Sequence, residues 1–193
     1  MAGEADPPKP YQHKMAKIYP RIDWSGQATY PKNEVPMVHP IKKVMFHFNT
    51  DVDVCTSWID CIHTMQVLQK RHLLEGSDDI KFNFLIGGDG QAYEGRGYDF
   101  KPCPSLRSLI TYPWPIKGEE DWERMDVAII GRYESYDDVP VPVQLGMYDV
   151  VELGVRKGIV DEFYSYYEIR NEEPPLEIPG YRADVPATID AEY

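Results

Sequence analysis

One short segment near the middle of the chain limits the possible folds more than any other. Residues 82–86 are Phe-Asn-Phe-Leu-Ile, and Gly-Gly-Asp-Gly follows at residues 87–90. Because glycine reaches positive φ without strain, these turn residues predict a tight reversal between two short strands. The segment lacks the Lys-Ser or Lys-Thr pair of a phosphate-binding loop. We therefore expect a β-hairpin here, in which turn geometry rather than catalysis explains Asp89.

The residues before the hairpin predict a strand and a helix. Period-two alternation places Phe46 and Phe48 on one face of a strand and His47 on the other. Ser57 then stands at a good N-cap position for a helix that extends to about Leu74. His47 is thus expected to face away from the two neighbouring phenylalanines.

Two more elements follow the hairpin. Residues 127–130 are a short apolar strand, and an apolar stripe over residues 142–155 predicts a long helix that starts with a proline in its first turn. Strands that alternate with helices in this way are typical of an α/β fold.

Proline density separates the two ends of the chain from its middle. Residues 1–40 contain seven prolines, which excludes regular helix and central strand there. We expect an extended N-terminal arm over residues 1–40, one domain over residues 41–170 with an insertion near residues 102–124, and an extended tail over residues 171–193. A chain of 193 residues with 42% hydrophobic content suits a single domain.

Charge and hydropathy narrow the range of partners and locations. A formal net charge of −12 disfavours nucleic acid and anionic membrane surfaces as partners. No apolar run approaches the roughly eighteen residues that a membrane helix needs, and the first ten residues have no apolar stretch typical of a secretory signal. We therefore expect an intracellular protein, cytoplasmic or cytoskeletal.

A resemblance to a known family covers about residues 18–170. Residues 79–98 closely resemble the central segment of peptidoglycan-recognition proteins (PGRPs), animal relatives of phage-type zinc amidases, which usually reads Asp-Ile-Gly-Tyr-Asn-Phe-Leu-Ile-Gly-Gly-Asp-Gly and continues to Tyr-Glu-Gly-Arg-Gly-Trp. Further segments resemble family motifs in the same order: residues 21–26, residues 44–47, the pair Cys55 and Cys61, and residues 127–131. The resemblance implies a mixed central β-sheet flanked by about three helices.

The resemblance also implies where catalytic residues should be. A zinc amidase needs three protein ligands and an open position for water. His47 aligns with the first histidine ligand, but Ile169 stands at the second, no cysteine follows Cys103, and Phe82 replaces the assisting tyrosine. None of the other histidines, at positions 13, 39, 63 and 72, makes a ligand pair with His47 at a usual spacing. We expect no metal, no cofactor and a pseudoenzyme.

The resemblance also indicates which residues of this chain align with the family's sugar-peptide groove and with its cysteine pair. By resemblance, the candidate ligand-binding residues are His47, Phe48, Gly76, Ser77, Arg96, Tyr98 and Pro104. Family histidines are replaced at Phe48 and Pro104 and a Gly-Trp pair at Gly76 and Ser77, while Arg96 is retained and expected to be exposed. The resemblance implies a disulfide between Cys55 and Cys61, whereas a reducing cytosol would keep two thiols. Both states remain open at this point.

Three functions are compatible with these residues. The favoured one is a non-catalytic, PGRP-like scaffold that binds protein partners in an intracellular assembly through residues 1–40 and 171–193, since extended Pro- and Tyr-containing segments suit grooves on partners. The second is an intracellular sensor of muropeptides in innate immunity, which needs a groove that still binds. The third is an active zinc N-acetylmuramoyl-L-alanine amidase, which needs ligands that the sequence does not show.

Overall fold

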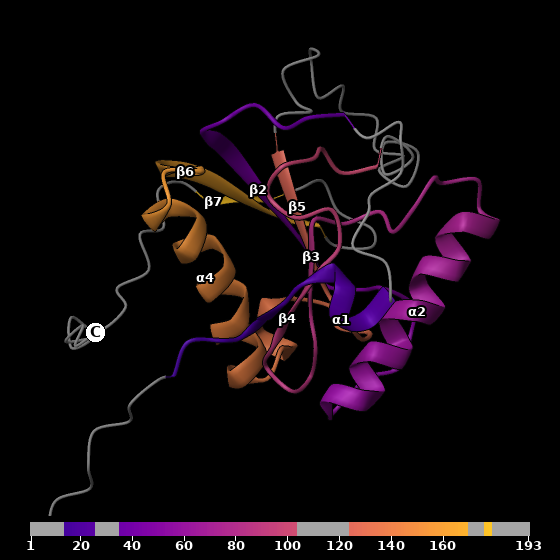
Figure 1. Cartoon of the computed structure of the whole chain (residues 1–193). Helices are drawn as coiled ribbons and strands as arrows, with labels where there is room; N and C mark the ends of the chain where they lie inside the picture. Colours follow the sequence, from indigo (N-terminus) through magenta and orange to yellow (C-terminus); the bar gives the residue numbers. More distant parts are fainter. Residues whose placement is uncertain (1–13, 26–34, 104–123, 170–175, 179–193) are drawn as a thin grey trace, which may run out of the picture.

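A mixed β-sheet forms the centre of the molecule (Figure 1). The computed structural model describes residues 14–25, 35–103, 124–169 and 176–178. Within these residues the strands are β1 (Ile18–Tyr19), β2 (Ile41–His47), β3 (Phe84–Ile86), β4 (Ala92–Glu94), β5 (Arg124–Ile129), β6 (Val160–Ile169) and β7 (Leu176–Ile178), in the order β1-β4-β3-β5-β2-β6-β7. The β3–β4 and β6–β7 pairs are antiparallel and the other pairs are parallel. The expected mixed sheet is confirmed.

Helices cover both faces of this sheet. Figure 1 shows α4 (Val141–Arg156) on one side and α1 (Arg21–Ser25) with α2 (Trp58–Leu74) on the other. On the α4 side the core contains Phe46, Phe48, Phe84, Val127, Val143, Met147 and Val150, and on the α2 side it contains Trp24, Cys61, Met65, Leu68, Leu85 and Ala128. Because side chains alternate between the two faces along each strand, the sheet contributes to two separate cores, one on each face. Within the described ranges, none of the helices combines the length and apolarity that a bilayer crossing demands.

Local signals explain where α2 and α4 begin and end. The Ser57 hydroxyl oxygen accepts a hydrogen bond from the Asp60 backbone N–H, which caps α2 as predicted. Past the C-terminus of α2, Gly76 has φ +88°, a conformation that favours glycine. Pro142 lies in the first turn of α4, where its missing N–H costs no hydrogen bond.

The hairpin is confirmed, and buried polar contacts fix it in place. Its strands β3 and β4 pair Phe84 with Glu94 and Ile86 with Ala92. The Asn83 side chain donates to the carbonyls of Gly97 and Phe100 at 2.8 and 2.7 Å, and it accepts from the Asp126 backbone N–H at 2.9 Å. One buried amide therefore ties the end of the hairpin to β5.

Both chain ends contribute more regular structure than their composition predicted. The prediction of no regular helix in residues 1–40 was wrong, because α1 occupies Arg21–Ser25 directly after Pro20. Its Trp24 is 1% exposed and donates from Nε1 to the Glu94 carbonyl at 2.7 Å, so tertiary contacts stabilise a helix too short to form alone. In the predicted tail, β7 pairs with β6, so the sheet extends past residue 170. Most of the predicted insertion, residues 104–123, lies outside the described residues.

Candidate functional site

His47, the one retained candidate ligand, lies at the C-terminal end of β2. Its neighbours in register are Ala128 on β5 and Ile169 on β6. The imidazole is buried, and its Nε2 lies 3.4 Å from Oδ1 of Asp126. As predicted, His47 is on the opposite face of the strand from Phe46 and Phe48. The imidazole therefore points into the protein on the α2 side of the sheet, toward the Asp126 carboxylate.

Asp126 on β5 is the electrostatic centre of this cluster. It is fully buried, and its Oδ1 lies 3.1 Å from Nε of Arg124, which is two residues away on the same strand face. Burial alone would raise the pKa of the Asp126 carboxyl, but the Arg124 guanidinium and His47 outweigh burial and hold that pKa below its ordinary value. The carboxylate is therefore charged and faces two partners inside the protein.

Phe82 separates His47 from a second buried histidine, His72. The Phe82 ring centroid is 5.1 Å from that of His47 and 5.7 Å from that of His72. Nδ1 of His72 accepts a hydrogen bond from the Lys81 backbone N–H at 3.2 Å. Burial, followed by the nearby Lys81 charge, lowers the pKa of His72 from 6.5 to about 4. His72 is therefore neutral at physiological pH.

This cluster does not provide the donors of a zinc site. A catalytic zinc requires three protein ligands around an open position. Ile169 and Phe82 border His47 with hydrocarbon, and Nε2 of His47 already faces Asp126. In the part of the chain that the structure describes, no group of three or more His, Cys, Asp or Glu side chains is placed to hold a metal. The residues present here do not fit the metal.

The other predicted groove residues do not gather around His47. Phe48 is 1% exposed and belongs to the core beneath α4. Tyr98 lies on that same side, where its hydroxyl donates to the Val150 carbonyl of α4 at 2.5 Å. Burial raises the pKa of Tyr98 above its ordinary value. The structure thus places these two side chains on the face of the sheet opposite to His47.

Arg96 is not the exposed side chain that the sequence suggested. It is 2% exposed, its Nε donates to the Ile80 carbonyl at 2.7 Å, and its Nη2 lies 2.5 Å from Oδ1 of Asp78. The sequence could not show this, because Asp78 is eighteen residues away and only the fold brings it near. Arg96 holds together the loop that leads into β3.

The remaining predicted residues lie at the end of α2 or outside the described residues. Gly76 is exposed and follows α2, whereas Ser77 is buried and its N–H donates to the His72 carbonyl at 2.9 Å. Pro104 lies outside the described residues. A ligand-binding role stays a prediction for all seven groove candidates.

The cysteine pair is bonded. Cys55 and Cys61 form a disulfide that joins the segment before α2 to its first turn. Cys103 is a buried free thiol. The resemblance-based pairing is therefore the state that the structure adopts.

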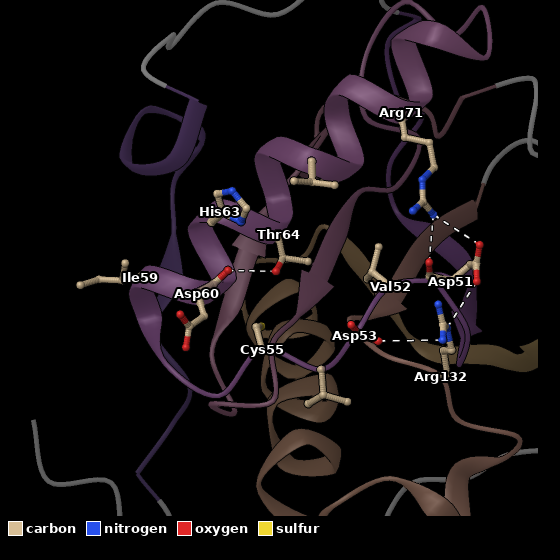
Figure 2. Close-up of a pocket in the computed structure, with 12 residues that line it drawn as sticks. Asp51, Val52, Asp53, Cys55, Ile59, Asp60, His63, Thr64, Arg71 and Arg132 are labelled. Carbon is tan, nitrogen blue, oxygen red and sulfur yellow. Dashed lines mark hydrogen bonds and ion pairs between the residues drawn. The ribbon is translucent and has the colours of Figure 1, made fainter.

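A pocket of about 590 Å³ lies beside this disulfide, on the outer face of α2 (Figure 2). One wall is the loop of residues 51–55, and the other is a ridge of α2 formed by Ile59, His63, Val67 and Arg71. Arg132, just after β5, completes it. No sequence motif indicated a site here, and of these residues only Cys55 and His63 had been considered, as a disulfide partner and as a possible metal ligand. The spacing of four residues along the ridge was the available signal, because such residues line one face of a helix.

Asp51 organises the charged end of the pocket. Its carboxylate lies 3.6 Å from Nη1 of Arg71 and 3.4 Å from Nε of Arg132, and its backbone carbonyl accepts from Arg71 at 3.0 Å. Figure 2 shows the two guanidinium groups reaching Asp51 from opposite sides. Arg132 also lies 3.9 Å from Asp53. All these side chains are substantially exposed, so each pair is weak by itself.

Comparison with known proteins finds sequence similarity to peptidoglycan-recognition proteins and to an amidase. No family model matches the chain. The chain is 38% identical over 143 residues to peptidoglycan-recognition protein 3 of Holotrichia diomphalia, covering 74% of this chain and 68% of that protein. It is 29% identical over 165 residues to peptidoglycan-recognition protein LB of Drosophila melanogaster, covering 83% of this chain and 64% of that protein. An N-acetylmuramoyl-L-alanine amidase of Sus scrofa is 36% identical over 150 residues, which is 77% of this chain but 23% of that enzyme.

Solved structures show the same fold. Wild-type Drosophila PGRP-LB gives a TM-score of 0.67 at 27% identity, covering 86% of this chain and 89% of that one. Bumblebee PGRP-SA gives 0.67 at 23% identity, with 85% and 89% covered. With the hairpin, the sheet order and the sequence identities in agreement, this chain belongs to the peptidoglycan-recognition protein family.

Proposed function

We propose that this chain is a non-catalytic binding protein built on the peptidoglycan-recognition fold. One observation carries the proposal: the histidine that aligns with a zinc ligand faces a buried carboxylate, and hydrocarbon side chains border it. Without three ligands and an open position, the described cluster around His47 cannot lower the pKa of a bound water or polarise an amide carbonyl. Curated relatives include a protein named as an amidase, so activity itself must be measured.

Zinc content and amidase activity test this proposal directly. The purified full-length protein, dialysed against zinc and then washed, should retain substoichiometric zinc by elemental analysis. It should also release no peptide from muropeptides under conditions in which an active zinc amidase does so. Stoichiometric zinc together with peptide release would overturn the proposal.

Protein partners are the first candidate ligands, and we propose that the chain acts as a scaffold. Support comes from how the ends join the domain: β1 and α1 come from the N-terminal segment and β7 from the C-terminal one. Partners bound by residues 1–13 and 179–193 would be held next to fixed edges of the sheet. Deleting those two segments, which leaves β1 and β7 intact, should abolish association with partners that co-purify with the full chain. Unchanged association would remove the terminal segments from the proposal.

The location of the protein affects this proposal. An intracellular location stays a prediction, and the bonded pair Cys55 and Cys61 counts against it, because disulfides persist mainly in oxidising compartments. Alkylation of the cellular protein after denaturation, without and with prior reduction, would decide the matter, because all three cysteines are buried in the folded state. If only Cys103 is alkylated before reduction, the protein has matured in an oxidising compartment; alkylation of all three would support the cytoplasmic or cytoskeletal assignment.

Muropeptide binding is the second candidate function, as part of an innate immune response. The curated relatives are named for peptidoglycan recognition, and PGRP-LE was solved in complex with tracheal cytotoxin, a monomeric diaminopimelic acid-type peptidoglycan. The pocket of about 590 Å³ is within the usual size range of small-molecule sites. Isothermal titration calorimetry with diaminopimelate-type and lysine-type muropeptides, with and without zinc, tests this role. Micromolar binding supports a sensor, and absence of heat favours the scaffold.

A further inference from the structure

We propose that the pocket between α2 and residues 51–55 docks a segment of a partner protein that carries aliphatic side chains next to a lysine or arginine. This inference rests on the binding role proposed above and names the chemistry of the partner. Three features of the pocket carry it: its exposed aliphatic surface, the contacts of both arginines with Asp51, and the excess of carboxylates over arginines in its lining.

The pocket exposes aliphatic side chains where the surface of a helix is normally polar. Ile59 is 72% exposed, Val54 44% and Val67 41%, and all three line the same pocket. Figure 2 shows Ile59 on the first turn of α2, with Val52 in the opposite loop. Exposed apolar residues that gather in one concave place, rather than singly, mark an interaction site. Among the described residues that line the pocket there is no Phe, Tyr or Trp, and the ring that is present is the His63 imidazole.

The two arginines of the pocket are already engaged. Asp51 contacts Arg71 on one side and Arg132 on the other, through oxygens of its carboxylate and its backbone. Asp51 has φ +53°, an uncommon conformation for a residue other than glycine, and the Asn49 side chain accepts from its N–H at 2.7 Å. The geometry that directs Asp51 to both guanidinium groups is therefore locally fixed. An anionic ligand would have to compete with it.

Over the whole lining of the pocket, the formal charge is negative. The lining has three aspartates, at positions 51, 53 and 60, against two arginines, so its formal charge is −1 with His63 neutral. The Asp53 side chain is 97% exposed and its only described ion pair is the 3.9 Å contact with Arg132. Asp60 is exposed at the rim and accepts from the Ser57 hydroxyl at 2.6 Å. Together with a chain charge of −12, this favours a cationic over an anionic ligand.

A pair of synthetic peptides tests the charge preference directly. The probes are the acetylated, amidated hexapeptides Leu-Lys-Leu-Ile-Lys-Leu and Leu-Glu-Leu-Ile-Glu-Leu, titrated into the methyl-labelled full-length protein and followed by NMR. We expect the lysine peptide to shift the methyl signals of Ile59, Val54 and Val67, with binding that weakens as salt rises. The glutamate peptide and an anionic muropeptide should shift them at least about tenfold more weakly.

Matched variants show whether the pocket carboxylates set this preference. Asp53→Asn with Asp60→Asn should weaken binding of the lysine peptide by about three- to tenfold, because each exposed pair is worth only a fraction of a tenfold step. Asp137→Asn with Glu162→Gln makes the same change in net charge on exposed residues of η2 (Tyr136–Asp138) and β6, and should have no effect.

Three results would overturn the inference: no methyl shift with the lysine peptide, equal or tighter binding of the glutamate peptide or muropeptide, or equal losses in the two variant pairs. None of these bears on zinc content, amidase activity or the effect of deleting the chain ends. Failure of this inference can therefore be told apart from failure of the proposed function.

Discussion

Acid should destabilise this protein in a pH range set by one buried histidine. The folded state keeps His72 neutral, because Nδ1 accepts a hydrogen bond from the Lys81 N–H and a protonated nitrogen cannot accept it. Burial comes first among the causes, followed by the Lys81 charge; Arg71 and Arg96 act in the same direction, and Glu75 opposes them. Because the pKa is lowered in the folded state, the stabilisation is complete above pH 6.5 and is lost as pH falls toward 4.

The size of this effect follows from the pKa change. Lowering the pKa of His72 from 6.5 to about 4 corresponds to about 3–4 kcal/mol of unfolding free energy, at 1.4 kcal/mol per pH unit. This is a large part of the 5–15 kcal/mol typical of a folded domain. The carboxyl of Asp126 contributes in a different pH range. Because its pKa is lowered in the folded state, its stabilisation is complete above the ordinary carboxyl pKa and is lost only as pH falls below that value.

Substitution of the histidine isolates its contribution. His72→Asn keeps an acceptor near the Lys81 N–H but removes the group that titrates. The contribution of this site to the unfolding free energy should then be nearly independent of pH between 6.5 and 4. His63→Asn, on the exposed face of the same helix, is the control and should retain the wild-type slope. Urea unfolding at pH 7, 5.5 and 4, followed by tryptophan fluorescence at constant ionic strength, measures the difference.

One result would refute the reasoning. If wild type and His72→Asn lose the same unfolding free energy between pH 7 and pH 4, to within about 1 kcal/mol, the buried imidazole does not control acid stability. A loss that His63→Asn abolishes would lead to the same conclusion. Calorimetric melting of the three proteins at each pH gives an independent measurement.

Three other substitutions have expected outcomes in urea unfolding at pH 7. Asp126→Asn leaves the buried Arg124 guanidinium without that carboxylate and should cost about 3 kcal/mol; a loss below about 1 kcal/mol would show that other contacts satisfy Arg124. Cys55→Ser with Cys61→Ser removes a short covalent loop and should cost about 2 kcal/mol, which reducing agent should reproduce in wild type but not in the variant. Ser57→Ala removes the N-cap of α2 and should cost about 1 kcal/mol; no change would mean that the disulfide alone fixes this turn.

Local sequence patterns were sufficient for much of the fold. The glycines of the hairpin, the N-cap of α2 and the apolar stripe of α4 each specify geometry over a few residues, and the structure follows all three. Two short elements were missed for different reasons. The helix α1 depends on contacts of Trp24 with β4 and α2, which lie more than forty residues away in the sequence. The strand β7 pairs with β6 only eight to twelve residues earlier, but its three residues lie between prolines and show no strand pattern.

The sequence alone determined the identities of the residues at the key positions, and therefore which of them cannot bind a metal. Isoleucine at position 169 and phenylalanine at position 82 cannot bind a metal in any fold, and that conclusion needs no coordinates. Only the tertiary structure decided how the candidate residues are placed: His47 lies against Asp126, Arg96 is buried on Asp78, and Asp51 contacts both arginines of the pocket. Burial and ion pairing depend on side chains far apart in the chain. Their effect on charge and access is therefore a property of the packed fold rather than of any local sequence pattern.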